Sequence, residues 1–301
     1  MGPENPFAVH ELFVFPPIMP LIKGEENYAV CFAIPAGTQG ITYVCQSGPM
    51  EAERREAEDI STLGMPEYGS AVSVLYVFDD VFVPWERVFM CGEIEFAEDL
   101  LTKFESTMNP LCACGCKVGF MDLIIGAAQT IAEYNGVAGA AHIRDKLTEM
   151  IRVRESLDVC GTAAVQNAKE DPSGSGVYFP DIMPGLMGNL ICHYDLPQAI
   201  LMAADVAGGS VVTYPSELDL RNPETSHYVE RFLKGVASVP TEDRMRMLKF
   251  LQHWTAGQET VRIWHGTYPP ATTRLILYRQ AEGSLEEKKK LAKKLAGIKE
   301  S

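Results

Sequence analysis

Positive charge is in short supply in this chain. Its 26 Lys and Arg residues are outnumbered by 40 Asp and Glu residues, which gives a formal net charge of −14 at pH 7. So acidic a protein is repelled by the phosphate backbone of nucleic acids, and we expect no nucleic-acid partner. The charge does not exclude an anionic cofactor, because such a cofactor needs only a local site.

Long apolar runs are also missing. No stretch of 18 uninterrupted apolar residues occurs, so we expect no membrane-spanning helix. The first residues, Met1 to Pro6, lack the basic segment and apolar run of a secretion signal. Cysteine is too sparse for a disulfide scaffold, with eight residues in 301. We therefore expect a cytoplasmic protein whose cysteines are reduced thiols or ligands.

The rest of the composition is that of an ordinary globular protein, with 47% hydrophobic and 22% charged residues. Up to about residue 95, short runs of β-branched and aromatic residues end at Pro, Gly or Asp, which is typical of β-strands. The predicted strands cover 11–15, 28–34, 41–45, 71–78 and 81–84. These strands are too few for a closed barrel or sandwich that hides its edges.

After Ile94 the hydrophobic period becomes helical. The run 117–135 is apolar nearly all round, so we expect it to be the buried centre of a helical bundle. The sequence predicts an α+β protein, with a small β domain at 1–95 and a C-terminal α-helical bundle at 96–301. The predicted helices cover 96–104, 117–135, 140–159, 181–193, 197–207, a segment beginning at 240–243, and a basic terminal helix at 285–294.

Three cysteines fall within five residues in the segment CACGCK, at 112–117. On a helix, Cys112 and Cys116 share a face and Cys114 points away. Thiolates select zinc or iron–sulfur clusters, but two ligands cannot complete a four-coordinate site. Lys117 would lower the pKa of a neighbouring thiol. The alternative is that these small, soft residues simply pack the start of a helix.

Two further segments combine glycine or histidine with a predicted helix end. Gly208 and Gly209, followed by Ser210, would let a backbone approach a ligand and present amides to phosphate oxygens. The alternative is an ordinary glycine stop at the end of a helix. His265 could act as a base or a hydrogen-bond donor, or it could be a packing histidine.

The segment YVFDDVFVPWERVF, at 76–89, resembles a signature of flavin-dependent 4-hydroxyphenylacetate 3-monooxygenases and 4-hydroxybutyryl-CoA dehydratases. The blocks GCKVG at 115–119 and HIRDKLTEM at 142–150 favour the dehydratase branch. The resemblance continues through DVAGG at 205–209 and VTYPSE at 212–217. Separated blocks in the same order, over nearly the whole chain, are more specific than any single motif.

This resemblance implies a fold similar to acyl-CoA dehydrogenases and an oligomer that binds FAD across a subunit interface. It places Gly208, Gly209 and Ser210 near the FAD diphosphate. The dehydratases also hold a [4Fe–4S] cluster by three Cys and one His, and they remove water from 4-hydroxybutyryl-CoA by a radical route. By resemblance, Cys116 is a cluster ligand and Lys117 a catalytic residue.

The chain also departs from the dehydratase pattern. It corresponds to the β domain and C-terminal bundle, whereas the family's N-terminal helical domain supplies two of the cluster cysteines. The family's His ligand falls on Asn109, a family Tyr on Ala113 and a catalytic Glu on Arg262, while His265 survives. Cys112 is a hypothetical replacement ligand, so a cluster would need ligands from another chain.

Three hypotheses remain open on the sequence. The chain is one subunit of a split dehydratase whose partner chain carries the helical domain, or it is a flavin enzyme without a cluster that acts on an acyl-CoA or an aromatic ring. The third hypothesis is a diverged, non-catalytic subunit. Bound flavin separates the second from the third, and a neighbouring gene for a helical domain with paired cysteines indicates the first.

Overall fold

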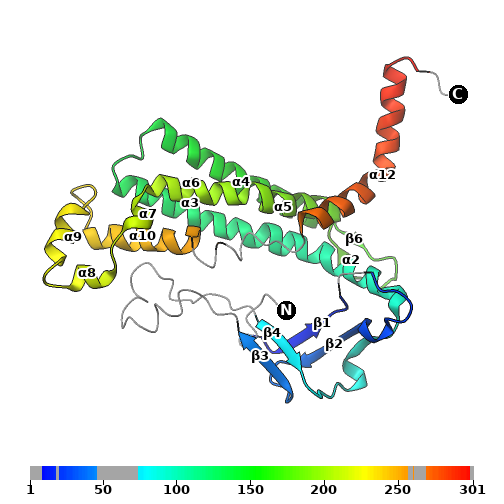
Figure 1. The fold of residues 1–301 in the computed structure, drawn as a ribbon. Helices are drawn as coiled ribbons and strands as arrows, with labels where there is room; N and C mark the ends of the chain where they lie inside the picture. Colours follow the sequence, from blue (N-terminus) through cyan, green and yellow to red (C-terminus); the bar gives the residue numbers. More distant parts are fainter. Residues whose placement is uncertain (1–8, 18–19, 46–73, 257–259, 261–268, 299–301) are drawn as a thin grey trace.

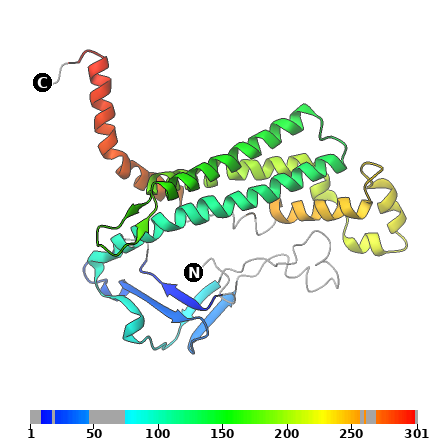
Figure 2. The same cartoon turned by 180° about the vertical axis from the view of Figure 1, so that it is seen from behind.

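The chain forms a small β part and a larger layer of long helices, as Figure 1 shows. The computed structural model describes residues 9–17, 20–45, 74–256, 260 and 269–298. Seen from behind in Figure 2, the strands lie together on one side of the helical layer, near the start of α2. The predicted α+β class is confirmed.

Two antiparallel sheets make up the β part. The first has the order β1-β2-β5, formed by Glu11–Val14, Val30–Pro35 and Val88–Cys91. In the second, β3 (Ile41–Cys45) pairs with β4 (Val74–Phe78). Four of the predicted strands are thus confirmed, although residues 71–73 at the start of one lie outside the described residues. Short 3-10 turns connect these strands and lead to the first helix: η2 (Glu26–Tyr28), η3 (Trp85–Arg87) and η4 (Ile94–Phe96).

The fifth predicted strand, at 81–84, is wrong. Asp80 has a φ of 50°, in the left-handed region, so the chain turns there instead of continuing as a strand. Phe82 is 81% exposed in the following loop, and Pro84 has no N–H for a sheet ladder. The strand forms instead at Val88–Cys91, where the backbone can pair with β2.

The long helices begin with α2 (Ala97–Met108) and α3 (Cys116–Tyr134), joined by a π-helix, η5 (Asn109–Gly115). Figures 1 and 2 show these three elements as one rod that crosses the molecule. The remaining elements follow in chain order: α4 (Ala141–Gln166), β6 (Lys169–Glu170), β7 (Tyr178–Phe179), α5 (Ile182–Tyr194), α6 (Leu196–Ala207), α7 (Ser210–Thr213), α8 (Glu217–Arg221), α9 (Ser226–Phe232), α10 (Thr241–Ala256) and α12 (Pro270–Leu295).

Local signals explain where several helices begin and end. Asp181 caps α5, because its carboxylate accepts a hydrogen bond of 3.0 Å from the Met183 N–H. Gly136 and Gly208 have φ of 71° and 73°, which suits glycine, and they end α3 and α6. The predicted terminal helix is longer than expected, since α12 begins at Pro270, a residue that is well tolerated in a first helical turn.

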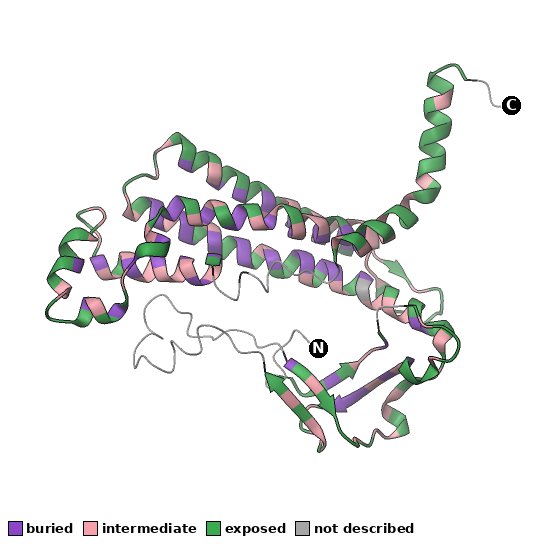
Figure 3. Ribbon diagram, in the orientation of Figure 1, coloured by how far each residue is buried: buried purple, intermediate pink, exposed green. Residues whose placement is uncertain are grey.

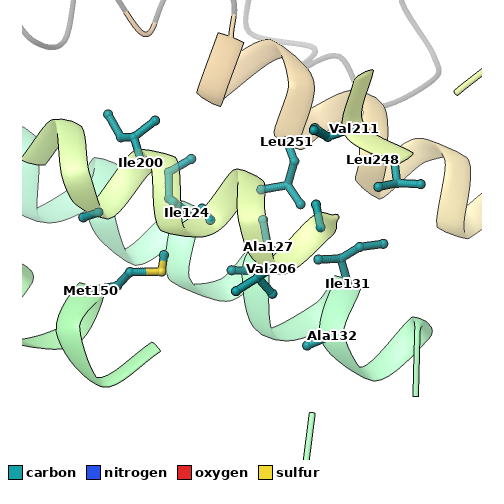
Figure 4. Close-up of a cluster of buried hydrophobic side chains, with 14 of the residues drawn as sticks. Ile124, Ala127, Ile131, Ala132, Met150, Ile200, Val206, Val211, Leu248 and Leu251 are labelled. Atoms are coloured by element: carbon teal, nitrogen blue, oxygen red, sulfur yellow. The ribbon is translucent and has the colours of Figure 1, made fainter. Parts of the chain in front are cut away.

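The main core lies where α3, α4, α6 and α10 meet. Figure 4 shows Ile124 and Ile131 of α3 beside Val206 of α6 and Leu251 of α10. The expectation that α3 is enclosed on all sides is wrong for one face, because Gly119, Asp122 and Leu123 are exposed. Figure 3 shows the same pattern, with buried positions alternating with exposed ones along the helix.

One helical stretch, Ile94–Tyr134, is long and apolar enough to cross a membrane by length and composition. The core helix of a soluble protein passes the same test. In this structure, α3 packs on α4, α6 and α10. The stretch is therefore weak evidence for a membrane span.

Candidate functional site

The π-helix η5 places the cysteine motif between α4 and α5. Its hydrogen-bond pattern is visible where the Cys116 N–H donates to the Leu111 carbonyl, five residues earlier. Pro110 stands at its start and has no N–H to continue the α-helical ladder, which explains the change of winding there. Single π-helical turns within α-helices are frequent at functional sites.

The three cysteines of the motif have different surroundings. Cys114 is buried, Cys112 is half-buried and Cys116 is exposed. Burial, together with a smaller effect of the neighbouring Cys160 and Cys192, raises the pKa of Cys114 to about 12. Burial also raises the pKa of Cys192 to about 11. Cys114 and Cys192 are therefore neutral thiols at physiological pH, which makes them poor nucleophiles.

Glycines on α4 and α5 allow the π-helix to pack this closely. A Cβ added at Gly161 would lie 2.9 Å from Cys114 Cβ, and one at Gly188 would overlap Cys114 Sγ. At Gly185 it would lie 3.1 Å from Asn109 Cβ. The two helices therefore present bare backbone to the π-helix, and no larger side chain fits there without displacing it.

A buried chain of hydrogen bonds also holds the π-helix. Asn109, its first residue, accepts a bond of 3.0 Å at Oδ1 from Asn189 Nδ2 of α5. The Thr273 hydroxyl of α12 lies 3.3 Å from Asn189 Oδ1 and 3.3 Å from the Pro269 carbonyl oxygen, so its one proton is shared between these two acceptors. All three side chains have zero exposed surface. The chain joins three elements that are far apart in the sequence.

Lys117 follows the π-helix and is only 7% exposed. In the part of the chain that the structure describes, no carboxylate forms an ion pair with it. Its charge lowers the pKa of Cys192, which places the ammonium group near that thiol. Lysine is almost never this buried without a partner, so this ammonium is a strong candidate for contact with a ligand.

The described residues alone do not provide the ligands of an iron–sulfur cluster. Among the described residues, no three His, Cys, Asp or Glu side chains gather where they could hold a metal ion. The Asn109 side-chain oxygen is already bonded to Asn189, and Cys114 faces the apolar interior as a neutral thiol. Cys112 and Cys116 are the two thiols that remain for the predicted metal site.

The glycine pair lies at the other end of α3. Gly208 and Gly209 are exposed, and a Cβ at either position would meet no atom within 4 Å. They follow Val206, which Figure 4 shows beside Ala127 and Ile131 in the C-terminal half of α3. This open backbone fits the close approach of a phosphate group as well as an ordinary helix stop.

The structure brings some predicted site residues together and separates others. Cys112, Cys116 and Lys117 lie within two turns of each other. The segment 208–210 is remote from them, because α3 has 19 residues and an α-helix rises about 1.5 Å per residue, or about 28 Å in all. His265 and Arg262 lie outside the described residues.

Sequence reasoning missed the residues that surround the π-helix. Gly185, Gly188, Asn189 and Cys192 line one buried face of α5. Their spacing of three, four and seven residues is that of a single helix face, and two glycines on it are a signal of close packing. Cys160 of α4 carries no such signal in the sequence.

Family models match nearly all of the chain. The model described as 4-hydroxyphenylacetate 3-hydroxylase C terminal matches residues 97–297, and the corresponding N-terminal model matches residues 5–90. The 4-hydroxybutyryl-CoA dehydratase/vinylacetyl-CoA-Delta-isomerase of Clostridium aminobutyricum is 35% identical over 96% of this chain. The chain spans only 60% of that relative's length.

Solved structures show the same similarity. An oxygen-tolerant archaeal 4-hydroxybutyryl-CoA dehydratase from N. maritimus superimposes with a TM-score of 0.88 at 34% identity, over 97% of this chain and 57% of that one. An oxygenase component of 4-hydroxyphenylacetate 3-monooxygenase, complexed with FAD, has a TM-score of 0.78 at 23% identity, over 96% and 60%. The chain belongs to the 4-hydroxyphenylacetate 3-hydroxylase family.

Proposed function

We propose that this chain is part of a flavin-dependent enzyme that dehydrates a 4-hydroxyacyl-CoA and isomerises the unsaturated product, like the clostridial and archaeal dehydratases. The observation that carries the proposal is the buried Lys117, which pairs with no carboxylate in the described residues. It lies in a chain that is 35% identical to such a dehydratase over nearly its whole length.

Lys117 acts on the substrate as a buried hydrogen-bond donor. An ammonium group offers three donors and no acceptor, so it binds the thioester carbonyl or the leaving hydroxyl oxygen. Because it lies in a low-dielectric interior, it stabilises negative charge on such an oxygen more strongly than an exposed lysine would. The Cys192 thiol beside it stays protonated and does not compete as an anion.

The open backbone at Gly208, Gly209 and Ser210 is the proposed contact with the FAD diphosphate. When bound, FAD would supply the one-electron oxidation that makes a non-acidic C–H bond of the substrate acidic. This segment and Lys117 lie at opposite ends of α3, so they do not form one site within a single chain. We expect a second copy of the chain, or a partner chain that carries a helical domain, to complete it in the cytoplasm.

The proposal is tested on the full chain, purified without oxygen both alone and together with the product of any neighbouring gene for a helical domain. Absorption spectra and flavin analysis report FAD, and the assay follows water loss from 4-hydroxybutyryl-CoA. Lys117→Ala should abolish turnover while FAD is retained. The matched control is Lys249→Ala, because Lys249 is a partly buried lysine on α10. Equal activity of the Lys117→Ala variant and the wild type would reject the assignment.

A second candidate is the hydroxylation of a phenol by reduced flavin and oxygen. Asn109 favours it, because the family's histidine ligand for the cluster is replaced by an amide that is already hydrogen-bonded. The monooxygenase component shares this fold. Formation of a catechol from 4-hydroxyphenylacetate, with no reaction of the CoA thioester, would favour this alternative. A preparation that binds no flavin under any condition would leave a non-catalytic role.

A further inference from the structure

By resemblance, Asn109 stands at the position of a histidine ligand in the dehydratases. In this chain its side chain instead makes a buried hydrogen bond between helices. Its side-chain oxygen accepts from Asn189, and the Asn189 oxygen is one of two acceptors of the Thr273 hydroxyl, the other being the Pro269 carbonyl. One lone pair of this oxygen accepts the Asn189 N–H, and this bond turns the Asn109 side chain toward α5. Asn109 therefore serves packing between helices rather than coordination.

The π-helix separates Asn109 from the exposed thiol of the motif. In an α-helix, residues seven apart share a face. In a π-helix each N–H bonds the carbonyl five residues earlier, and the chain turns through a smaller angle per residue. Asn109 and Cys116 therefore no longer lie on the same helix face. Their burial agrees, since Asn109 has no exposed surface and Cys116 is exposed. The two positions that would have to hold one cluster face different surroundings.

Close packing leaves no room for a large group beside Asn109. A Cβ at Gly185 would lie 3.1 Å from Asn109 Cβ and 3.3 Å from Pro110 Cδ. The Cys114 side chain occupies the space in front of Gly188. The face of α5 that meets the π-helix is therefore filled by protein atoms.

We infer that Asn109, Asn189 and Thr273 form a positioning chain that holds the π-helix, and with it Lys117, by buried hydrogen bonds instead of through an iron–sulfur cluster. The three residues act through Lys117 and do not touch the substrate themselves. This inference rests on the proposed function for the role of Lys117. Its structural part, the fixing of the π-helix from α12, is independent of the reaction.

The hydrogen-bond chain is tested by amide hydrogen exchange of the full chain, read on peptides that cover residues 109–117. Thr273→Val removes the hydroxyl and keeps the shape, so exchange in the π-helix should accelerate about tenfold. Thr273→Ser keeps the hydroxyl and should restore protection. Thr255→Val is the matched control, because Thr255 is a buried threonine on α10 that bonds its own helix at Leu251.

Iron analysis tests the second half of the inference. The wild-type chain, purified without oxygen and together with its helical partner if one exists, should hold far less than four iron atoms per chain. Four iron and four sulfide per chain would overturn the inference, as would unchanged exchange of residues 109–117 in Thr273→Val. If exchange responds but neither 4-hydroxybutyryl-CoA nor 4-hydroxyphenylacetate reacts, the positioning chain stands and the proposed function fails.

Discussion

Gly188 offers a direct test of how the π-helix packs. An added Cβ in the Gly188→Ala variant would overlap Cys114 Sγ and would also lie 3.4 Å from Cys160 Cβ. Cys114 cannot turn away easily, because it has zero exposed surface and its own Cβ already faces Gly161. The substitution must therefore displace the π-helix from α5.

The magnitude follows from two opposing effects. Overpacking a well-filled core costs up to about 3 kcal/mol, and this site is at the upper end because the atoms overlap. Replacing glycine by alanine inside a helix increases the free energy of unfolding by about 1 kcal/mol, because alanine has the higher helix propensity. We expect a net loss of about 2 kcal/mol in the free energy of unfolding, and a melting temperature lower by about 4–8 °C.

The assay is urea or thermal unfolding of the wild type and four variants: Gly188→Ala, Gly119→Ala, Cys114→Ala and the double variant of Gly188→Ala with Cys114→Ala. Gly119→Ala, on the exposed face of α3 with no atom within 4 Å of the new Cβ, should stabilise the chain by about 0.5–1 kcal/mol. Cys114→Ala removes the overlapping sulfur, so Gly188→Ala should cost much less in that background. Full stability of Gly188→Ala alone, or an equal cost with and without Cys114, would refute this account of the packing.

Three more predictions follow from the structure. Gly209→Val should lower the FAD content of the purified protein without changing its melting temperature, whereas Gly139→Val, at another open glycine, should leave the FAD content unchanged. Gly40→Ala should destabilise the β part by about 1–3 kcal/mol in urea unfolding, because Gly40 has a φ of 94° and its Cβ would lie 2.6 Å from a backbone carbonyl oxygen. The pKa values of Cys114 and Cys192 are raised in the folded chain to about 12 and about 11 from 9.0. Above pH 9 the unfolded chain loses these protons more readily than the folded chain, so the free energy of unfolding falls as the pH rises from 9 toward 12. Urea unfolding at pH 8 and pH 10.5 should show a smaller loss in Cys114→Ala than in the wild type, and an equal loss would contradict the assignment.

Much of the fold could be predicted from local patterns. The strand runs in the first part of the chain, the apolar run at 117–135 and the glycine stop at 136 each carry a signal within a few residues. The strand predicted at 81–84 was wrong because the sequence around Asp80 does not show whether the chain turns there or only pauses between two strands. The family resemblance was also readable from the sequence, since separated motifs keep their order.

The sequence alone determined most of the strands and long helices and the family, and it singled out the segment 112–117 as a candidate site. Only the tertiary structure decided that Lys117 is buried, that Cys114 is enclosed by Cys160 and Cys192, and that Asn109 bonds Asn189. These properties depend on contacts between segments about 45 to 80 residues apart, which leave no local period in the sequence. Whether a polar group is buried, and which partner it bonds, depends on the distant helix that packs against it. The packing of the helices therefore decides both properties.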